Sequence, residues 1–207
     1  MKKRKVNNLL ALAVLSYLTQ RPMHPYELSR SLRDHGDDRS IRFTHASLYM
    51  VVGQLARAGF VVEHETSREG GRPERTVYAL TDAGREELHD WMRDLVGEPN
   101  HEYPQFVAAL SLIAALPPQE VLGLLDHRLA RLAEQRAEIR DLVDRTVASG
   151  VHPLFLVEEE YRLALLDAEA GFVRDFVARI TDPEAGWGPM WATFHGRSTH
   201  QDERQEP

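Results

Sequence analysis

Residues 44–59, which read THASLYMVVGQLARAG, decide the fold of the 207-residue chain. Apolar residues recur in this segment at Leu48, Val52 and Leu55, the spacing of one face of an α-helix. The segment begins with a threonine, which is a good N-cap residue, and ends with a glycine, at which helices commonly stop. The sequence therefore predicts a capped helix that ends at about Ala58 and buries one apolar face.

The pattern changes after this helix. Residues 60–66 (FVVEHET) and 75–80 (RTVYAL) are rich in β-branched and aromatic residues, and the turn-forming sequence Gly70-Gly71-Arg72-Pro73 lies between them. We therefore expect a β-hairpin with arginine side chains near its tip.

Three further helices are predicted around this central part. Residues 7–20 are apolar on nearly every face, which indicates burial on more than one side, by the rest of the domain or by a second subunit. Pro25 suits the first turn of a second helix, which ends at Gly36. Thr81 caps the last of these helices, which ends at residues 97–100. The order helix, helix, helix, hairpin, helix is that of a winged helix-turn-helix.

This fold gives particular residues a candidate role in binding DNA. Its third helix enters the major groove, where short polar side chains meet base edges, and its hairpin lies on the backbone, where arginines meet phosphates. The candidate DNA-binding residues are Tyr26, Thr44, His45, Ser47, Tyr49, Arg68, Arg72 and Arg75. Each also has an ordinary interpretation as solvated surface, protected sheet edge or core. These residues occur together on the elements of a winged helix-turn-helix, in the order that this fold requires, and this favours the DNA interpretation.

Charge is distributed unevenly along the chain. The formal net charge is −7, yet residues 1–75 carry 13 Lys and Arg against 8 Asp and Glu, and the remainder carries 12 against 24. A basic N-terminal part suits a nucleic-acid partner. We expect the run Lys2-Lys3-Arg4-Lys5 to be either an arm that reaches a phosphate backbone or a solvated tail.

The beginning of the chain and the cysteine count bear on the compartment. The basic run and the apolar run Leu9–Leu15 resemble a signal peptide, but the apolar run is short and no cleavage site of small residues follows it. The chain has no cysteine, which excludes disulfide scaffolds and thiolate metal sites. We predict a cytoplasmic protein without a membrane partner.

Helices alone are predicted beyond Asn100, over residues 105–116, 119–148 and 153–180. The second of these has a heptad-like seam, Leu122, Leu125, Leu129 and Leu132, interrupted at Arg136. The fold class is thus mainly α, with an N-terminal winged helix-turn-helix followed by a C-terminal helical dimerisation domain. The predicted divisions are residues 1–97 for DNA binding, 98–182 for dimerisation and an effector, and 183–207 as a flexible tail, in which Trp187, Met190 and Trp191 could dock. We expect a homodimer formed by the helices over residues 7–20, 119–148 and 153–180.

No catalytic or metal-binding motif is found. The sequence lacks a Gly-x-Gly-x-x-Gly motif, a P-loop, a nucleophile elbow and a His-Glu-x-x-His motif, and its ten histidines show no ligand spacing. The consecutive Glu158, Glu159 and Glu160 splay around a helix instead of forming an acid/base pair. We predict a protein that is not an enzyme and that needs neither cofactor nor metal.

Aromatic residues are the candidates for binding an effector. Trp91, Tyr161 and Phe172 could line a site for a small apolar or aromatic molecule between helices. The ordinary alternative is that these side chains form the core or the dimer interface.

Residues 9–95 resemble the DNA-binding domain of the PadR-like transcriptional regulators. His24-Pro25-Tyr26-Glu27-Leu28 is similar to the family's His-Gly-Tyr-Glu-Leu, Ala46-Ser47-Leu48-Tyr49 to its Gly-Thr-Leu-Tyr, and residues 71–84 (GRPERTVYALTDAG) to its wing and the start of its fourth helix. Pro25 replaces the usual Gly, and Met50-Val51 replaces the more common Pro. The resemblance implies a homodimeric repressor that binds a near-palindromic operator in double-stranded DNA, with C-terminal helices that complete the dimer and a DNA affinity that can respond to a small molecule.

Two other functions remain open at this point. A winged helix can serve as a protein-interaction module that never touches DNA, which an acidic recognition helix and wing would favour. A small-molecule-binding protein whose DNA activity has decayed is the second alternative.

Overall fold

The computed structural model describes residues 4–67 and 75–195 of the chain. It divides into two compact units, an N-terminal unit (Met1–Glu102) and a C-terminal unit (Tyr103–Pro207). The described residues are mainly helical and contain one two-stranded antiparallel sheet. The mainly α class with an N-terminal winged helix-turn-helix is therefore confirmed.

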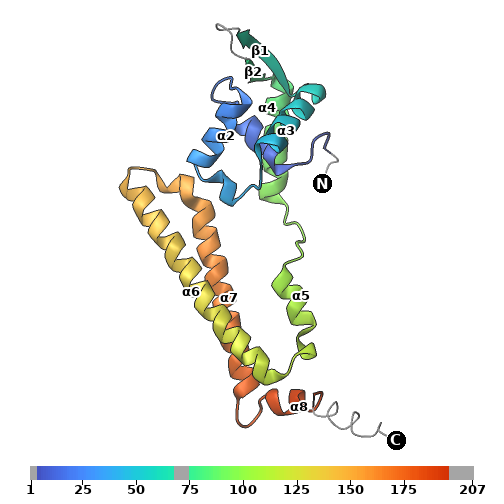
Figure 1. Ribbon diagram of the computed structural model, residues 1–207, viewed down its shortest axis with the longest axis vertical. Coiled ribbons are helices and arrows are strands. Elements are labelled where there is room, and N and C mark those ends of the chain that lie inside the picture. Colours follow the sequence, from blue (N-terminus) through green and yellow to red (C-terminus); the bar gives the residue numbers. More distant parts are fainter. Residues whose placement is uncertain (1–3, 68–74, 196–207) are drawn as a thin grey trace, which may run out of the picture. The chain divides into compact units, whose positions relative to one another are not determined.

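The N-terminal unit follows the predicted order of elements (Figure 1). Its helices and strands are α1 (Leu9–Tyr17), α2 (Pro25–Asp34), the 3-10 turn η1 (Asp37–Arg39), α3 (His45–Ala58), β1 (Val61–Ser67), β2 (Arg75–Leu80) and α4 (Asp82–Gly97). The first helix is shorter than residues 7–20 because Asn8 caps it, accepting a hydrogen bond from the Leu10 N–H at 2.9 Å, and because turns follow Tyr17.

The ends of α3 form as the sequence predicts. Thr44 is its N-cap residue and lies in the extended region. Gly59 ends the helix with a φ of 80°, a left-handed conformation that costs glycine little. Inside these ends, Leu48, Val52 and Leu55 are buried together with Val51.

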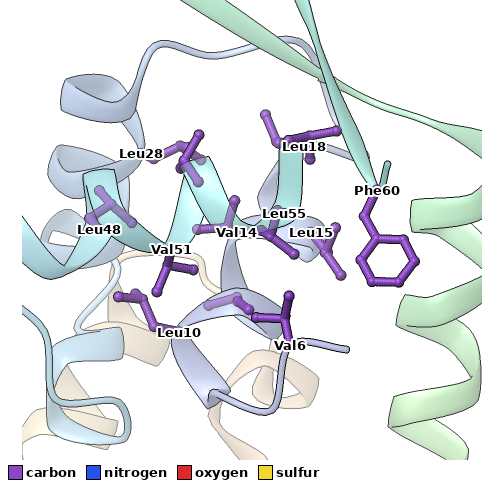
Figure 2. Close-up of a cluster of buried hydrophobic side chains, with 14 of the residues drawn as sticks. Val6, Leu10, Val14, Leu15, Leu18, Leu28, Leu48, Val51, Leu55 and Phe60 are labelled. Atoms are coloured by element: carbon purple, nitrogen blue, oxygen red, sulfur yellow. The ribbon is translucent and has the colours of Figure 1, made fainter. Parts of the chain in front are cut away.

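The core of the N-terminal unit gathers α1, α2, α3 and the start of β1 (Figure 2). Helix α1 packs against α3 and α4, and α2 packs against α3. The buried residues of α1 are Leu10, Ala11, Ala13, Val14 and Leu15. The sequence allowed either the rest of the domain or a second subunit to cover the apolar faces of α1. The core of its own unit covers most of them.

The hairpin is joined to the helices through its second strand. Val61 pairs with Leu80 and Glu63 with Tyr78, and the register is irregular between Glu63 and Glu65. On the other side of β2, Tyr78 exchanges two backbone hydrogen bonds of 3.0 Å with Met23, just before α2. This bridge fixes the base of the hairpin relative to the start of α2.

Arg4 differs from its predicted place in a basic arm. Its side chain is 1% exposed, with Nη1 donating to Glu87 Oε1 at 2.7 Å and Nη2 to Asp94 Oδ2. The guanidinium lies 5.2 Å from the ring centroid of Trp91. The prediction was wrong for this residue because α4 offers it two carboxylates and an aromatic face, which a charge run in the sequence does not reveal.

The regular elements in the described part of the C-terminal unit are all helices. Its elements are α5 (Gln105–Ser111), the 3-10 turn η2 (Ile113–Ala115), α6 (Pro118–Ala148), the 3-10 turn η3 (Pro153–Leu156), α7 (Val157–Thr181) and α8 (Gly188–Ala192). Helices α6 and α7 run side by side (Figure 1).

The apolar seam of α6 is largely used within the chain. Val121, Leu125, Leu132 and Ile139 are buried, and the first two share a core with residues of α7. Arg136, which interrupts the heptad pattern, pairs with Asp167 of α7 at 2.6 Å. The seam therefore serves mainly the contact between α6 and α7, and a second subunit needs another surface.

Residues 183–195 belong to the segment that was predicted as a flexible tail in which Trp187, Met190 and Trp191 could dock. Asp182 accepts hydrogen bonds from the backbone N–H groups of Ala185 and Glu184, which lower the pKa of its carboxyl, and α8 follows. Trp191 is buried against Phe176 and Ile180. The Trp191 ring thus packs within the chain, and residues 196–207 lie outside the described part.

None of the helices among the described residues is both long and apolar enough to span a membrane. The same residues contain no group of three His, Asp or Glu side chains arranged to hold a metal ion.

Candidate nucleic-acid interface

The N-terminal end of α3 is shaped by a reciprocal cap. The Thr44 N–H donates to Ser47 Oγ at 2.8 Å, and the Ser47 N–H donates to Thr44 Oγ1 at 3.1 Å. The Ser47 hydroxyl also donates to the Thr44 carbonyl at 2.9 Å. Both hydroxyls therefore satisfy backbone groups of the helix end and hold its shape.

The predicted aromatic residues lie beside this end. The rings of Tyr26 and His45 are parallel within 4°, with centroids 6.2 Å apart, and both side chains are exposed. The Tyr49 ring lies edge-on to His24, with centroids 6.1 Å apart. Tyr26 is 60% exposed and Tyr49 49%, so neither tyrosine is a core residue.

The motif residues 24–28 explain how Tyr26 comes to this surface. The Tyr26 N–H donates to His24 Nδ1 at 3.0 Å, and the His24 N–H donates to Glu27 Oε2 at 3.0 Å, which caps α2. Leu28 is fully buried. The cap and the buried leucine fix the helix, and Tyr26 is left on its outer face.

Arg33 is a residue of this surface that the sequence analysis missed. Its Nη1 lies 3.2 Å from His45 Nε2, and its guanidinium lies 5.6 Å from the ring centroid of Phe43. Arg33 follows Tyr26 by seven residues and so lies on the same face of α2. That spacing is the signal that could have identified it.

The wing is described only in part. Arg68 and Arg72 lie outside the described residues. Arg75 begins β2, and its backbone pairs with Ser67. The base of the hairpin is therefore bonded to the residues that precede α2 and α4. Its candidate phosphate contacts stay predictions.

Two tyrosines of the N-terminal unit have shifted pKa values. Burial and a hydrogen bond to Asp37 raise the pKa of Tyr17. Burial and the neighbouring Glu63 carboxylate raise the pKa of Tyr78 on β2. Both phenols therefore stay protonated at neutral pH and act as hydrogen-bonding groups without charge.

The three candidate effector residues belong to different units of the chain. Trp91 is 2% exposed and lies in the core of the N-terminal unit under Arg4. Tyr161 and Phe172 belong to the C-terminal unit, where they are 66% and 45% exposed on α7. Eleven residues of helix separate these two by about 16 Å. Phe172 instead stacks on Phe176 with centroids 6.0 Å apart.

The N-terminal unit contains the residues that match a known protein family. Residues 14–90 match the model of the transcriptional regulator PadR-like family. The negative transcriptional regulator PadR of Bacillus subtilis is 25% identical over 143 residues, which are 69% of this chain and 77% of that protein.

Solved structures of Bacillus subtilis PadR share the fold. The structure of that protein in complex with operator DNA is 21% identical, covers 80% of this chain and 99% of its own, and superposes with a TM-score of 0.61. Its structure in complex with p-coumaric acid is 18% identical, covers 86% of this chain and 97% of its own, and has a TM-score of 0.66.

Proposed function

We propose that this chain, whose residues 14–90 form a PadR-like family domain, is a DNA-binding transcriptional regulator that acts as a homodimeric repressor. The match supports this proposal because the matched residues include α3, whose polar N-terminal end lies exposed beside α2. In a winged helix this end is the part that enters the major groove. The role is non-enzymatic and cytoplasmic.

The candidate residues contact DNA from α2, from α3 and from the wing. His45 and Tyr49 face the bases or the adjacent backbone from α3, while Thr44 and Ser47 hold the helix end and direct its N–H groups toward the DNA. Tyr26 contacts the backbone from α2. Arg68, Arg72 and Arg75 bind phosphates from the wing.

Binding of duplex DNA by the full-length chain tests this function. Fluorescence anisotropy with DNA from upstream of the protein's own gene, in competition with random-sequence DNA, should give sequence-selective and salt-dependent binding. Equal affinity for both DNAs would contradict a sequence-specific regulator. Absence of binding to any duplex would favour a protein-interaction module.

The wing arginines give the first prediction. Arg75→Ala or Arg72→Ala should weaken binding to all duplexes similarly and reduce the slope of log K against log salt concentration by about one unit, because one phosphate contact is lost. Arg131→Ala removes an equal charge from α6, where Arg131 pairs with Glu134, and should leave the slope unchanged. An unchanged slope in the wing variants would remove the wing from the interface.

An exposed stripe on α7 supports the homodimer. Tyr161, Leu165, Ala168 and Phe172 are all exposed and follow one another at coiled-coil spacing. Leu154, Phe155 and Val157 precede this stripe and are exposed as well. We propose that a second copy of the chain covers the stripe, since soluble monomers rarely expose an apolar surface of this extent.

The oligomeric state gives the second prediction. Light scattering should report about 47 kDa, twice the 23.6 kDa of one chain. Leu165→Glu should give monomers with much weaker operator binding, because a buried carboxylate opposes association and one subunit contacts only one half-site. Val96→Glu adds the same charge to an exposed residue of the N-terminal unit and should leave the dimer intact. A monomeric wild-type chain that binds DNA tightly would refute the dimer.

We propose further that a small aromatic molecule modulates the affinity for DNA. Bacillus subtilis PadR has been crystallised with p-coumaric acid, and this chain exposes aromatic rings on α7. Such a molecule shifts the equilibrium only by binding one arrangement of the dimer better than another. Because the Trp91 ring is covered by Arg4 and about 16 Å of helix separates Tyr161 from Phe172, one such molecule can contact only one of these two exposed rings of a chain.

A further inference from the structure

The contact between Arg33 and His45 assigns the proton of the imidazole. A guanidinium has five N–H donors and no acceptor, so a hydrogen bond from Arg33 Nη1 to His45 Nε2, 3.2 Å away, requires Nε2 to accept. The ring hydrogen of a neutral His45 is then on Nδ1. The contact therefore selects one of the two tautomers and leaves Nδ1–H as the donor.

Two further contacts set the direction of this donor. The Tyr26 ring from α2 is parallel to the His45 ring within 4°. The guanidinium of Arg33 lies against the ring of Phe43, which precedes α3. The imidazole is thus held on one face by the Tyr26 ring and at Nε2 by Arg33, both of which belong to α2. Arg33 in turn lies against Phe43, from the loop between α2 and α3.

A histidine held in this tautomer can pair only with hydrogen-bond acceptors on the bases. The major-groove acceptors are N7 of both purines, O6 of guanine and O4 of thymine, and each of them requires a donor from the protein. A histidine of free tautomer can present a donor or an acceptor, whereas His45 held at Nε2 presents a donor alone.

We propose that Arg33 is a positioning residue that determines sequence specificity, because it holds His45 as an Nδ1–H donor for an acceptor on a base edge of double-stranded DNA. This inference rests on the proposed function and adds a residue to it. Arg33 acts through His45, so its loss should relax the base preference at one operator position. Loss of a simple phosphate contact would instead lower the affinity for all sequences alike.

The test uses the full-length chain and a duplex that the wild-type protein selects from a random-sequence library. Affinities are measured for this duplex and for all its single-base-pair variants. Arg33→Gln should reduce discrimination at one position, or at its symmetry mate, by about tenfold. Arg30→Gln is the matched control, because Arg30 is an exposed arginine of the same helix that pairs with Asp34. It should keep the wild-type ranking of the duplexes.

Coupling to His45 separates positioning from a general effect of charge. In the His45→Ala background, Arg33→Gln should cause no further change in the ranking, since the reading group is already absent. His45→Asn retains an N–H donor near the Nδ1 position and should keep part of the preference even when Arg33 is replaced.

The tautomer itself is a second readout, independent of DNA. Two-bond ¹H–¹⁵N spectra of the free wild-type protein should show His45 protonated at Nδ1, and Arg33→Gln should produce a mixture of tautomers. An Nε2–H tautomer in the wild type, or an unchanged ranking with Arg33→Gln, would overturn the inference and leave the proposed function standing. Failure of the wild-type protein to select any duplex would overturn the proposed function instead.

Discussion

Replacement of Gly84 by alanine should destabilise the N-terminal unit by roughly 3 kcal/mol, because the added methyl group overpacks a site that cannot relax. A Cβ at this position would lie 2.0 Å from the Phe60 carbonyl oxygen and 2.9 Å from the Phe60 carbonyl carbon. These are backbone atoms at the start of the hairpin, and the Thr81 N–H is hydrogen-bonded to the same carbonyl. The first turn of α4 must therefore move away from the hairpin.

Chemical denaturation of the full-length chain measures this effect. The transition of the N-terminal unit should move to lower denaturant concentration, and DNA binding should weaken because the hairpin is displaced. Gly97→Ala is the control on the same helix, since a Cβ there meets nothing within 4 Å, and it should leave stability unchanged or raise it by up to about 1 kcal/mol. Equal stability of the two variants would contradict the close approach of α4 to Phe60.

Replacement of Arg4 by alanine should cost about 3 kcal/mol of folding free energy, because it leaves two carboxylates without the cation that is buried between them. Glu87 and Asp94 lie on one face of α4 and both receive hydrogen bonds from Arg4. The guanidinium also covers Trp91, so packing is lost together with charge. The loss should persist at high salt concentration, since a buried ion pair is screened little.

Two variants separate the charge contribution from the packing contribution. Arg4→Met retains most of the volume over Trp91 but leaves the carboxylates, so it should still be strongly destabilised. Addition of Glu87→Gln and Asp94→Asn to Arg4→Met should recover most of the stability, because no unpaired charge then remains. Lys5→Ala, at the exposed neighbouring position, should change stability little. Thermal and chemical denaturation give the comparison, and failure of the triple variant to recover would contradict the ionic account.

The local signals in the sequence were sufficient for the elements of the N-terminal unit. Helix α3 begins after Thr44 and ends before Gly59, as the capping preferences of these residues predict. Leu48 and Leu55 are buried, as their spacing predicts. Caps and periodicity depend on residues only three or four positions apart, and such patterns are visible in a single sequence. The winged helix-turn-helix order and the exposed site on α3 follow from these patterns.

Partners distant in the sequence could not be predicted in this way. Arg4 was expected in a solvated or phosphate-binding arm, and its partners Glu87 and Asp94 are far away in the chain. The spacing of Arg33 from Tyr26 places both on one face of α2, but the contact of Arg33 with His45 of α3 is visible only in the structure. A charged residue has the same appearance in the sequence whether it is solvated, paired or bound to DNA, because its environment is made by other elements.

The sequence was therefore enough to establish the winged helix-turn-helix, the boundaries of α3 and the exposed face of α3, since each is encoded in local spacing. Only the tertiary structure decided which partners the apolar and charged side chains contact. It turned the seam of α6 toward α7, with Arg136 paired to Asp167, and left the stripe at Tyr161, Leu165 and Phe172 exposed. The physical reason is that periodicity determines which side of a helix is apolar, whereas the partner of that side depends on which elements the connecting loops bring next to it.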